Sequence, residues 1–451
     1  MRNYFSLFLI LAQLSLMAQN DKIQLQEPLE GYWTGALVRL GNSVQILTAD
    51  IYKEEEDTLR FAGSIPDWAY YGPSVSGLRQ RDDSLEFNTY YGPASVRLDT
   101  AFMEMTGTVG TYDPPLFIHL KKSLKPYQPE ILSTELALQN EGANISGTLY
   151  YPDYAARSKL ACAVMVHGRG CSSRKSLASR ARLLARYGLA TFVYDKRGSE
   201  ASGFACYQSN HDLNVSDVKH IVNQLAKNPR VDANRIGLIS YSAGGWIAPQ
   251  VAATSETPVA FLITLVGPTT SVLQQQLDGM EAFVLEEGLD EASQKDALRY
   301  TRLLFARDDQ NKVFDELQNL VDRGKKAGWT EWLETDDYVY SADSFDQLWV
   351  QRFSHDPAPD LKAYPGPFLA IFGEKDFIVP YRIQVEQLES LMQEAQKENY
   401  QVKVLSQARH DLEHGSQIRE LGGNARYFKY DRVAYGAVQY IIDFLREEGV
   451  L

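Results

Sequence analysis

Residues 239–245 are Ile239-Ser240-Tyr241-Ser242-Ala243-Gly244-Gly245, and this stretch decides the fold. A short apolar run, 235–239, leads into it, and the helix-compatible run 246–253 follows. A strand that turns sharply into a helix pushes the corner residue out over the end of a sheet. Its neighbours must be small, because strand and helix pack closely there. The pattern therefore predicts an exposed hydroxyl at Ser242. The alternative is a glycine-rich turn after a core strand.

Length and composition describe an ordinary globular protein. The chain has 451 residues, of which 44% are apolar and 23% charged, and its net charge is -13. At about 100–200 residues per domain, two or three domains are expected. The acidic balance provides no basic surface, so we expect no nucleic-acid partner.

The first 19 residues resemble a targeting segment. Arg2 is followed by an apolar run that fades near the small residue Ala18. This order is typical of a secretory signal peptide. The run is shorter than the roughly 20 residues that a membrane span needs. We therefore expect a secreted or periplasmic protein without a stable membrane anchor.

Residues 25–124 and 130–451 follow different patterns. The first region has short alternating strands with aromatic residues and Gly, Pro and Asp turns, which predicts a small antiparallel barrel or sandwich. The second begins with a hairpin, 131–138 with 144–151, and then alternates continuous apolar strands with helices. That alternation predicts a mostly parallel, doubly wound α/β sheet covered on both faces. The expected strands are 161–166, 189–194, 235–239, 261–266, 368–372 and, last, 402–405, with a closing helix over 431–447.

Four motifs at strand ends together resemble the α/β-hydrolase superfamily, nearest to secreted bacterial serine hydrolases of the prolyl-oligopeptidase-like and serine aminopeptidase-like groups. They are His167-Gly168-Arg169-Gly170, Tyr194-Asp195-Lys196-Arg197-Gly198, the serine turn with its strand, and Phe372-Gly373-Glu374-Lys375-Asp376. The resemblance covers about residues 130–451 and implies the fold but no particular substrate. This chain departs from the usual Gly-x-Ser-x-Gly pattern by carrying Ser240 at the first glycine.

Acyl transfer needs a nucleophile, a base that takes its proton and a carboxylate that holds the base. In this fold they follow in the order Ser, Asp or Glu, His. Asp376 lies in the loop after the 368–372 strand, where the acid is expected, and Glu374 is the weaker candidate. His410 follows the last strand and is the predicted base, whereas His414 is expected to have a peripheral role.

Two backbone N–H groups should stabilise the developing oxyanion. We expect them from Ala243, which follows the nucleophile, and from Arg169. His167 should orient the turn that holds Arg169 through hydrogen bonds. The Arg169 side chain is expected either to meet a substrate carboxylate or to be solvated. Residues 195–198 should brace the loops over the site through ion pairs.

Residues 268–360 form an insertion between two strands and are expected to be a helical cap. Helices are predicted at 271–285, 291–306 and 311–325, and over an aromatic-rich stretch, 329–353. Its aromatic residues are expected either to line an acyl or aryl pocket or to form the core of the cap itself. They are Trp329, Trp332, Tyr338, Tyr340 and Trp349.

Cys171 and Cys206 both follow strand ends on the predicted catalytic face. Because export makes oxidation available, we expect a disulfide between them that fixes the two loops beside the site. Cys162 lies in a buried strand and is expected to act as a small apolar residue.

The predicted function is hydrolysis of carboxylic esters through Ser242, Asp376 and His410, without a cofactor or metal. Esters are favoured over peptides because no charged element for a peptide terminus is evident. The partner is a small ester or short peptide, and the oligomeric state stays open. An aminopeptidase using the same triad is the alternative. Remoter ones are a binding protein that works through its β domain and a zinc peptidase, since residues 410–414 match H-x-x-E-H.

Overall fold

The computed structural model describes residues 29–39, 43–55, 58–64, 76–81, 83–89, 92–101, 103–110, 116–125, 129–156, 158–307, 309–418, 428–433 and 436–451. The predicted signal peptide lies outside them. The chain divides into two compact units, Met1–Tyr127 with Ser416–Lys429, and Gln128–Gly415 with Tyr430–Leu451. Among the described residues, no helix combines the length and apolarity that a bilayer crossing requires.

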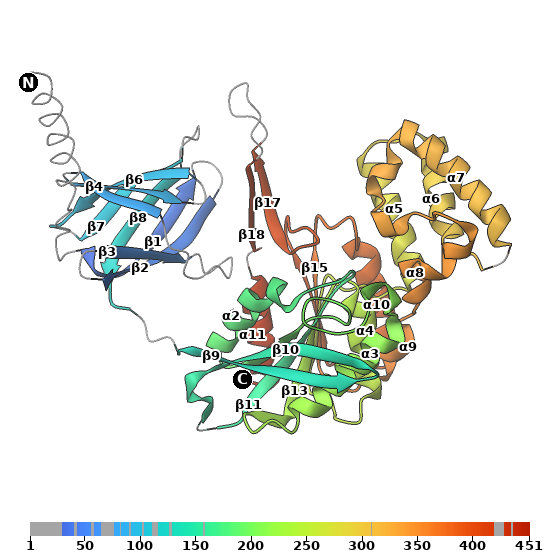
Figure 1. Cartoon of the computed structure of the whole chain (residues 1–451), viewed down its shortest axis with the longest axis horizontal. Coiled ribbons are helices and arrows are strands. Elements are labelled where there is room, and N and C mark those ends of the chain that lie inside the picture. Colours follow the sequence, from blue (N-terminus) through green and yellow to red (C-terminus); the bar gives the residue numbers. More distant parts are fainter. Residues whose placement is uncertain are drawn as a thin grey trace, which may run out of the picture. The chain divides into compact units, whose positions relative to one another are not determined.

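The first unit is built on one antiparallel sheet (Figure 1). Its order is β3-β2-β1-β8-β7-β6-β5-β4, so that the first and last strands of this sheet in chain order, β1 and β8, are neighbours. On β6 and β8 buried and exposed residues alternate, as expected for a sheet with one apolar face. The strands are β1 (Gly31–Arg39), β2 (Ser43–Glu55), β3 (Thr58–Ser64), β4 (Ser76–Arg81), β5 (Ser84–Thr89), β6 (Gly92–Asp99), β7 (Glu104–Val109) and β8 (Leu116–Ser123).

This sheet curls on itself. The ring of Phe61 on β3 stacks on Phe87 on β5 with 5.1 Å between centroids, although the two strands stand first and seventh in the sheet. Gly35 on β1 allows the curl, because a Cβ there would lie 1.9 Å from the His119 carbonyl oxygen of β8. Of the two expected forms, the structure is therefore a barrel-like sheet, and its interior is filled by side chains such as Trp33.

The second unit contains an eight-stranded sheet in the order β16-β15-β14-β13-β11-β12-β10-β9. From β12 to β16 all neighbours are parallel, and the two antiparallel pairs are β10 with β12 and β10 with β9. Four of the parallel strands, β11, β12, β14 and β15, are buried along their whole length, whereas most residues of the edge strand β16 are half-buried. Continuous burial of the central strands confirms the predicted fold class. The strands are β9 (Ile131–Asn140), β10 (Ala143–Pro152), β11 (Leu160–Val166), β12 (Ala190–Tyr194), β13 (Val231–Tyr241), β14 (Leu262–Leu265), β15 (Phe368–Gly373) and β16 (Tyr400–Leu405).

Helices cover both faces of this sheet. One apolar core joins its first face to α3 (His211–Leu225), α4 (Gly244–Thr254), α9 (Ala358–Ala363) and α10 (Tyr381–Glu394). A second core joins the opposite face to α2 (Ala178–Arg186) and α11 (Ala437–Glu447). The carboxyl ends of the parallel strands stay free of these helices, and the predicted motifs all lie there.

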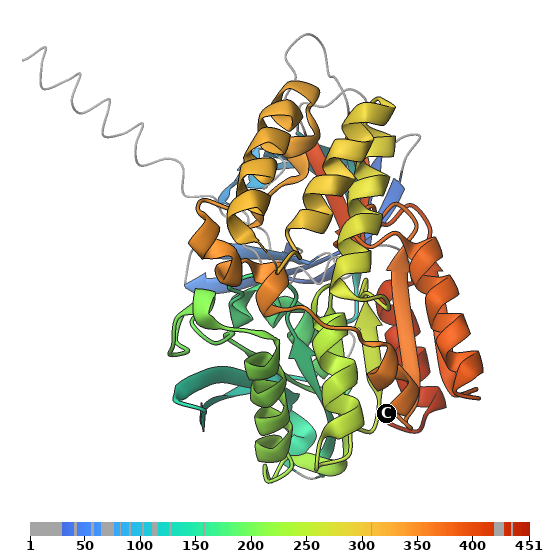
Figure 2. The ribbon, with the colours of Figure 1, turned by 90° about the vertical axis from the view of Figure 1, so that its right-hand side faces the viewer.

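The insertion is helical, as predicted, and its yellow and orange helices stand above the sheet in Figure 2. Three helices form most of it, namely α5 (Val272–Glu286), α6 (Glu291–Leu303) and α7 (Gln310–Ala327). The expected helix over 329–353 is wrong, because Glu334 and Ser341 cap new turns with their side chains. The stretch folds instead as short 3-10 turns, η6 (Trp329–Trp332), η7 (Thr335–Asp337) and η8 (Ala342–Gln347), followed by α8 (Trp349–Arg352).

The C-terminal prediction also needs correction. β16 is not the last strand, since β17 (Glu413–Ile418) and β18 (Phe428–Val433) form a two-stranded sheet after it. The closing helix starts at Ala437 rather than 431, behind Gly436, whose φ of 89° suits glycine.

Candidate active site

Ser242 sits at the corner between β13 and α4. Its φ is +47°, a conformation that is uncommon outside glycine, and it turns the residue out of the strand. Gly244 and Gly245 make the corner possible. A Cβ on Gly244 would lie 2.9 Å from the carbonyl oxygens of Val166 and His167, and one on Gly245 would lie 2.7 Å from the backbone of Gly267. Small residues here let α4 pack closely on the ends of β11 and β14, as the sequence predicted.

Three side chains distant in sequence meet at this corner. His410 Nε2 lies 2.8 Å from Ser242 Oγ, and His410 Nδ1 lies 2.9 Å from Asp376 Oδ2. A neutral ring that is protonated on Nδ1 donates to the carboxylate and accepts from the serine hydroxyl. The structure therefore brings together the three residues selected from the sequence as nucleophile, base and acid.

Asp376 is fixed from two sides. Its Oδ1 accepts hydrogen bonds from the backbone N–H groups of Ile378 and Val379, both at 2.9 Å, while Oδ2 faces the histidine. The residue is only 5% exposed. Glu374, the other candidate acid, accepts instead from Ser406 Oγ and Gln407 N–H.

His410 lies in the turn between β16 and β17. The turn is closed by a bond from the Arg409 N–H to the Glu413 carbonyl, and β17 begins at Glu413. The segment that matches H-x-x-E-H is thus a turn followed by a strand, whereas that zinc signature requires a helix. The side chain of His414 is outside the described residues.

The turn after β11 borders the nucleophile. A Cβ on Gly168 would lie 3.2 Å from Ser242 Cβ, so the backbone of this turn runs against the serine. The N–H groups of Arg169 and Ala243, expected to hold an oxyanion, make no hydrogen bond to another backbone group in the described part of the chain. His167, 3% exposed, orients the turn as predicted, since its Nε2 donates to the Tyr194 carbonyl at 2.5 Å. Burial lowers the pKa of His167 to about 4, so its ring is neutral.

Residues 195–197 bind the loops beside the site. Lys196 Nζ donates to the Gly168 carbonyl at 2.9 Å. Arg197 forms a fully buried ion pair with Asp217 at 2.5 Å. Asp195 accepts from the Arg174 N–H at 2.8 Å and lies 3.6 Å from the Arg174 guanidinium.

The Arg169 side chain differs from both expectations, because it binds the cap. Its Nη2 contacts the carboxylates of Asp336 and of Asp337, the latter at 3.1 Å, and lies 3.7 Å from Glu334. The guanidinium also stacks 4.3 Å from the centroid of the Trp349 ring. The side chain of Arg169 thus binds the cap, while its backbone belongs to the turn that borders Ser242.

A hollow of about 640 Å³ opens over Ser242 and His410. An aromatic wall runs along it, where Trp332 lies 5.3 Å from Phe283 and 5.6 Å from Phe377 between ring centroids. Leu177, Leu333 and Ile378 add apolar surface. Such a pocket suits an apolar acyl or aryl group.

Of the five aromatic residues considered from the sequence, only Trp332 lines this hollow. Trp329 and Trp349 are both buried in the cap core, while Tyr338 is half-buried and Tyr340 is 71% exposed. Sequence reasoning missed Phe283 and Phe377. Phe377 follows Asp376 directly, so its position in the acid loop was the available signal.

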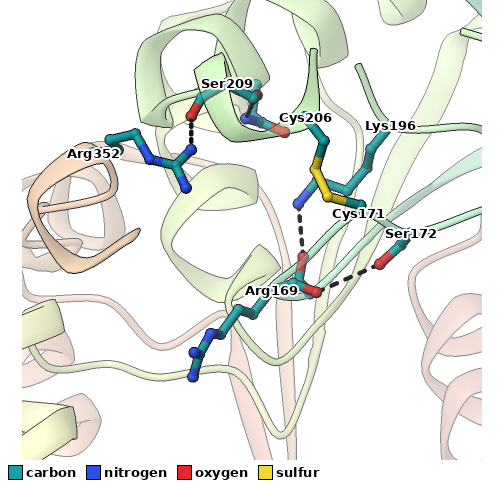
Figure 3. The surroundings of a disulfide bond; sticks show 9 residues. Arg169, Cys171, Ser172, Lys196, Cys206, Ser209 and Arg352 are labelled. Atoms are coloured by element: carbon teal, nitrogen blue, oxygen red, sulfur yellow. Dashed lines mark hydrogen bonds between the residues drawn. A yellow bond between two sulfur atoms is a disulfide. The ribbon is translucent and has the colours of Figure 1, made fainter. Parts of the chain in front are cut away.

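The predicted disulfide between Cys171 and Cys206 is present, with 5.8 Å between the Cα atoms (Figure 3). It joins the turn after β11 to the segment after β12. Cys162 is free and buried in β11, as expected.

Comparison with known proteins places this geometry in a family. Residues 163–420 match the sequence model of the alpha/beta hydrolase family. An esterase of Pyrococcus furiosus shares 14% identity over 70% of this chain and 91% of its own, with a TM-score of 0.42. Est1E of Butyrivibrio proteoclasticus, solved with ferulic acid, shares 14% identity over 69% of this chain and 96% of its own, with a TM-score of 0.41. The alpha/beta hydrolase GrgF of a Penicillium species shares 17% identity over 71% of this chain and 100% of its own, with a TM-score of 0.43. A search of curated proteins gave no match. Because the family model spans more than half of its 451 residues, the chain belongs to the alpha/beta hydrolase family.

Proposed function

We propose that this protein is a serine hydrolase that cleaves carboxylic esters through Ser242, His410 and Asp376. The observation that carries the proposal is the unbroken hydrogen-bonded chain from Asp376 Oδ2 through the imidazole to Ser242 Oγ, with distances of 2.9 and 2.8 Å. The serine end of this series of hydrogen bonds lies in the largely apolar hollow beside the cap. A hydroxyl so placed has a base within reach and room for a substrate.

In the proposed reaction, Ser242 Oγ attacks the ester carbonyl carbon while His410 Nε2 takes the hydroxyl proton. Asp376 stabilises the resulting imidazolium and keeps the ring oriented. The carbonyl oxygen becomes an oxyanion that the N–H groups of Ala243 and Arg169 stabilise. The intermediate collapses when the C–O bond to the alcohol breaks and His410 returns the proton to the departing oxygen.

The acyl group is then bound to Ser242 as an ester. Water attacks it with His410 as the base, through a second tetrahedral intermediate. Cleavage of the Oγ–C bond releases the acid, and the proton returns to the serine. The proton transfers use Ser242 and His410, with Asp376 behind them, and these three side chains already lie within hydrogen-bond distance of one another.

A fluorophosphonate probe tests the nucleophile, since it reacts with an activated serine. We expect the wild-type protein to be labelled on a peptide containing Ser242 and the Ser242→Ala variant to remain unlabelled. Loss of activity on adding a chelator, with recovery on adding zinc, would contradict a serine mechanism.

An aminopeptidase acting through the same residues is the second candidate. Glu331 and Glu334 line the hollow, and carboxylates suit the amino terminus of a peptide. A panel of short-chain, long-chain and aryl esters beside aminoacyl amides separates the two. The ester proposal expects kcat/KM to favour the esters by more than their greater intrinsic reactivity, and Glu331→Gln to leave that preference unchanged. A strong loss of amide hydrolysis in Glu331→Gln would favour the peptidase.

We also propose that the protein acts outside the cytoplasm, in the periplasm or medium. The Cys171–Cys206 bond supports this, because disulfides persist in oxidising compartments. Fractionation of cells that express the full chain tests it, with a shortened product in the exported fraction as the expected result.

A further inference from the structure

A second, smaller hollow lies behind the turn that borders Ser242. Its volume is about 180 Å³, which exceeds the roughly 30 Å³ that one water occupies in the liquid. Gly168 and Arg169 line both hollows, and Ala243 lines this one as well. It therefore adjoins the backbone groups assigned above to the ester carbonyl. We call it the Lys196–Arg352 hollow, after the two cations that face it.

Four cationic side chains line this hollow, and two of them already have ionic partners. Arg197 pairs with the buried carboxylate of Asp217, and Arg169 pairs with Asp336, the one acidic residue of the lining, and with Asp337. Lys196 and Arg352 remain. No carboxylate lies within salt-bridge distance of either among the residues that the structure describes.

The partners of these two cations are neutral. Lys196 donates to the Gly168 carbonyl and lies 5.6 Å from the centroid of the Phe353 ring. Arg352 donates to the carbonyls of Ser209 and Gln347 and lies 5.7 Å from the same ring. Figure 3 shows both side chains reaching toward the space beside the disulfide.

Lys196 and Arg352 line the same hollow and lie near the same aromatic ring, that of Phe353. Lys196 is only 4% exposed. Burial, and then the charge of Arg352, lower the pKa of Lys196 to about 8, so at neutral pH most of its population is still cationic. Buried cations are normally paired. Neither cation forms an ion pair with a described residue, although the charge of Asp336, which is bound to Arg169, also acts on Arg352. A hollow with more cations than carboxylates in its lining has the composition of an anion site.

We propose that the Lys196–Arg352 hollow binds a carboxylate group carried by the substrate, next to its scissile ester. The proposal rests on the proposed function for the position of the ester. The hollow suits a carboxylate because Arg352 offers a planar pair of N–H donors and Lys196 a point charge. Trp349 and Phe353 also line the hollow and provide apolar surface for a short linker. The favoured substrates are therefore acidic esters, such as half-esters of dicarboxylic acids or esters of hydroxybenzoates.

The full-length Ser242→Ala protein tests this without turnover. Calorimetric titration compares phenyl valerate with monophenyl glutarate, which carries a carboxylate on the acyl side, and with 4-(valeryloxy)benzoate, which carries it on the alcohol side. We expect at least one acidic ester to bind about tenfold more tightly than phenyl valerate, the effect of one charge-assisted hydrogen bond.

Introducing Arg352→Gln into the Ser242→Ala protein should abolish the tenfold preference for the acidic ester over phenyl valerate. The glutamine amide still provides a donor for the Ser209 carbonyl. Lys196→Gln provides the second variant. Arg302→Gln, at an exposed arginine of the same cap, is the matched control and should retain the ratio. Circular dichroism verifies that each variant is folded.

Free glutarate forms the last arm. If it binds with an affinity that depends on Arg352, the hollow also accepts carboxylates from the medium. Equal affinities for all three esters, or a ratio that survives both Arg352→Gln and Lys196→Gln, would overturn the proposal. Failure of the proposed function has a different signature, namely no fluorophosphonate labelling of the wild-type serine.

Discussion

At the scale of single residues, Ser240 and Ser242 occupy the same corner with different surroundings. Ser240 is fully buried in β13, whereas Ser242 lies in the hollow beside His410. Ser242→Ala should reduce kcat by roughly four to six orders of magnitude, leaving the part due to binding and the oxyanion groups. Ser240→Ala should cost far less. Steady-state kinetics on one ester checks both, and equal losses would show that the nucleophile is misassigned.

His410 and His414 provide the second comparison. Activity should fall in acid, because a protonated His410 cannot accept the serine proton. His410→Ala should abolish acylation and remove this part of the pH profile. His414→Ala should keep both. A single-turnover assay across the acidic range distinguishes them, and the reverse result would move the base to His414.

Two other histidines affect stability. Burial lowers the pKa of His167 and of His211 to about 4, and for His211 the neighbouring charge of His355 adds to the effect. Between pH 6.5 and 4 the unfolded chain binds more protons than the folded one, so stability should fall as pH decreases through this window. Each site contributes up to about 3 kcal/mol to that loss, at about 1.4 kcal/mol per pKa unit.

Urea denaturation at pH 7 and pH 4.5 measures this loss. His211→Gln should reduce it, since an amide does not titrate. His220→Gln on the same helix is the control. An undiminished decline in His211→Gln would contradict this explanation.

The meeting of Ser242, Asp376 and His410 was predictable because the fold limits where such residues can lie. Asp376 and His410 follow two strands whose carboxyl ends lie on one edge of the sheet, and the chain order of this fold leaves few choices. The Arg169 side chain was not predictable in the same way. Its partners, Asp336 and Asp337, are 167 and 168 residues away on a cap turn. Local sequence contains no information on that pairing.

At the scale of elements, the contact between Arg169 and η7 attaches the cap to the turn after β11. Arg169→Met should loosen the cap and raise KM for esters, while the backbone N–H at this position is retained. A lysine should substitute poorly, because it lacks the planar fork of donors. Hydrogen exchange over 329–352 should increase in the variant.

Arg323→Met is the matched control for the Arg169 variant. Arg323 binds Asp296 in an exposed pair between two cap helices, 2.6 Å apart. Exposed pairs of this kind contribute at most about 1 kcal/mol. If both variants change exchange and KM alike, Arg169 has no special role in docking the cap.

Helices and strands were predicted correctly where the apolar periodicity of the sequence is strong. The prediction failed where side-chain capping ends one turn and starts the next. The buried strands and the helices α5 to α7 stand close to their predicted bounds, because their apolar patterns are regular. The stretch 329–348 is rich in aromatic residues, which suggested a helix. The side chains of Glu334 and Ser341 instead cap separate short turns within it. β17 and β18 pair with each other in a separate sheet, and β17 contains one apolar residue, Ile418, so no apolar alternation marked it in the sequence.

At the scale of the whole molecule, the disulfide is the covalent link between two loops of the catalytic face. Cys171 and Cys206 are 35 residues apart. In the chain-entropy model, closing such a loop stabilises the fold by roughly 3–4 kcal/mol. The double variant Cys171→Ser/Cys206→Ser should therefore unfold at lower urea concentration and lower Tm. Reducing agent should reproduce the effect in the wild type and change nothing in the variant. A variant as stable as the wild type would contradict this role.

The third thiol gives that bond a further consequence. Three cysteines allow three different single pairings, but Cys162 is wholly enclosed between the neighbours of β11 once the sheet has formed. From then on only Cys171 and Cys206 can reach each other, so oxidation forms the native disulfide. Before that point all three thiols compete. The order of events is therefore decisive for the yield of correctly made protein: a chain that meets an oxidant before its central strands assemble risks a crosslink that the finished sheet would never permit.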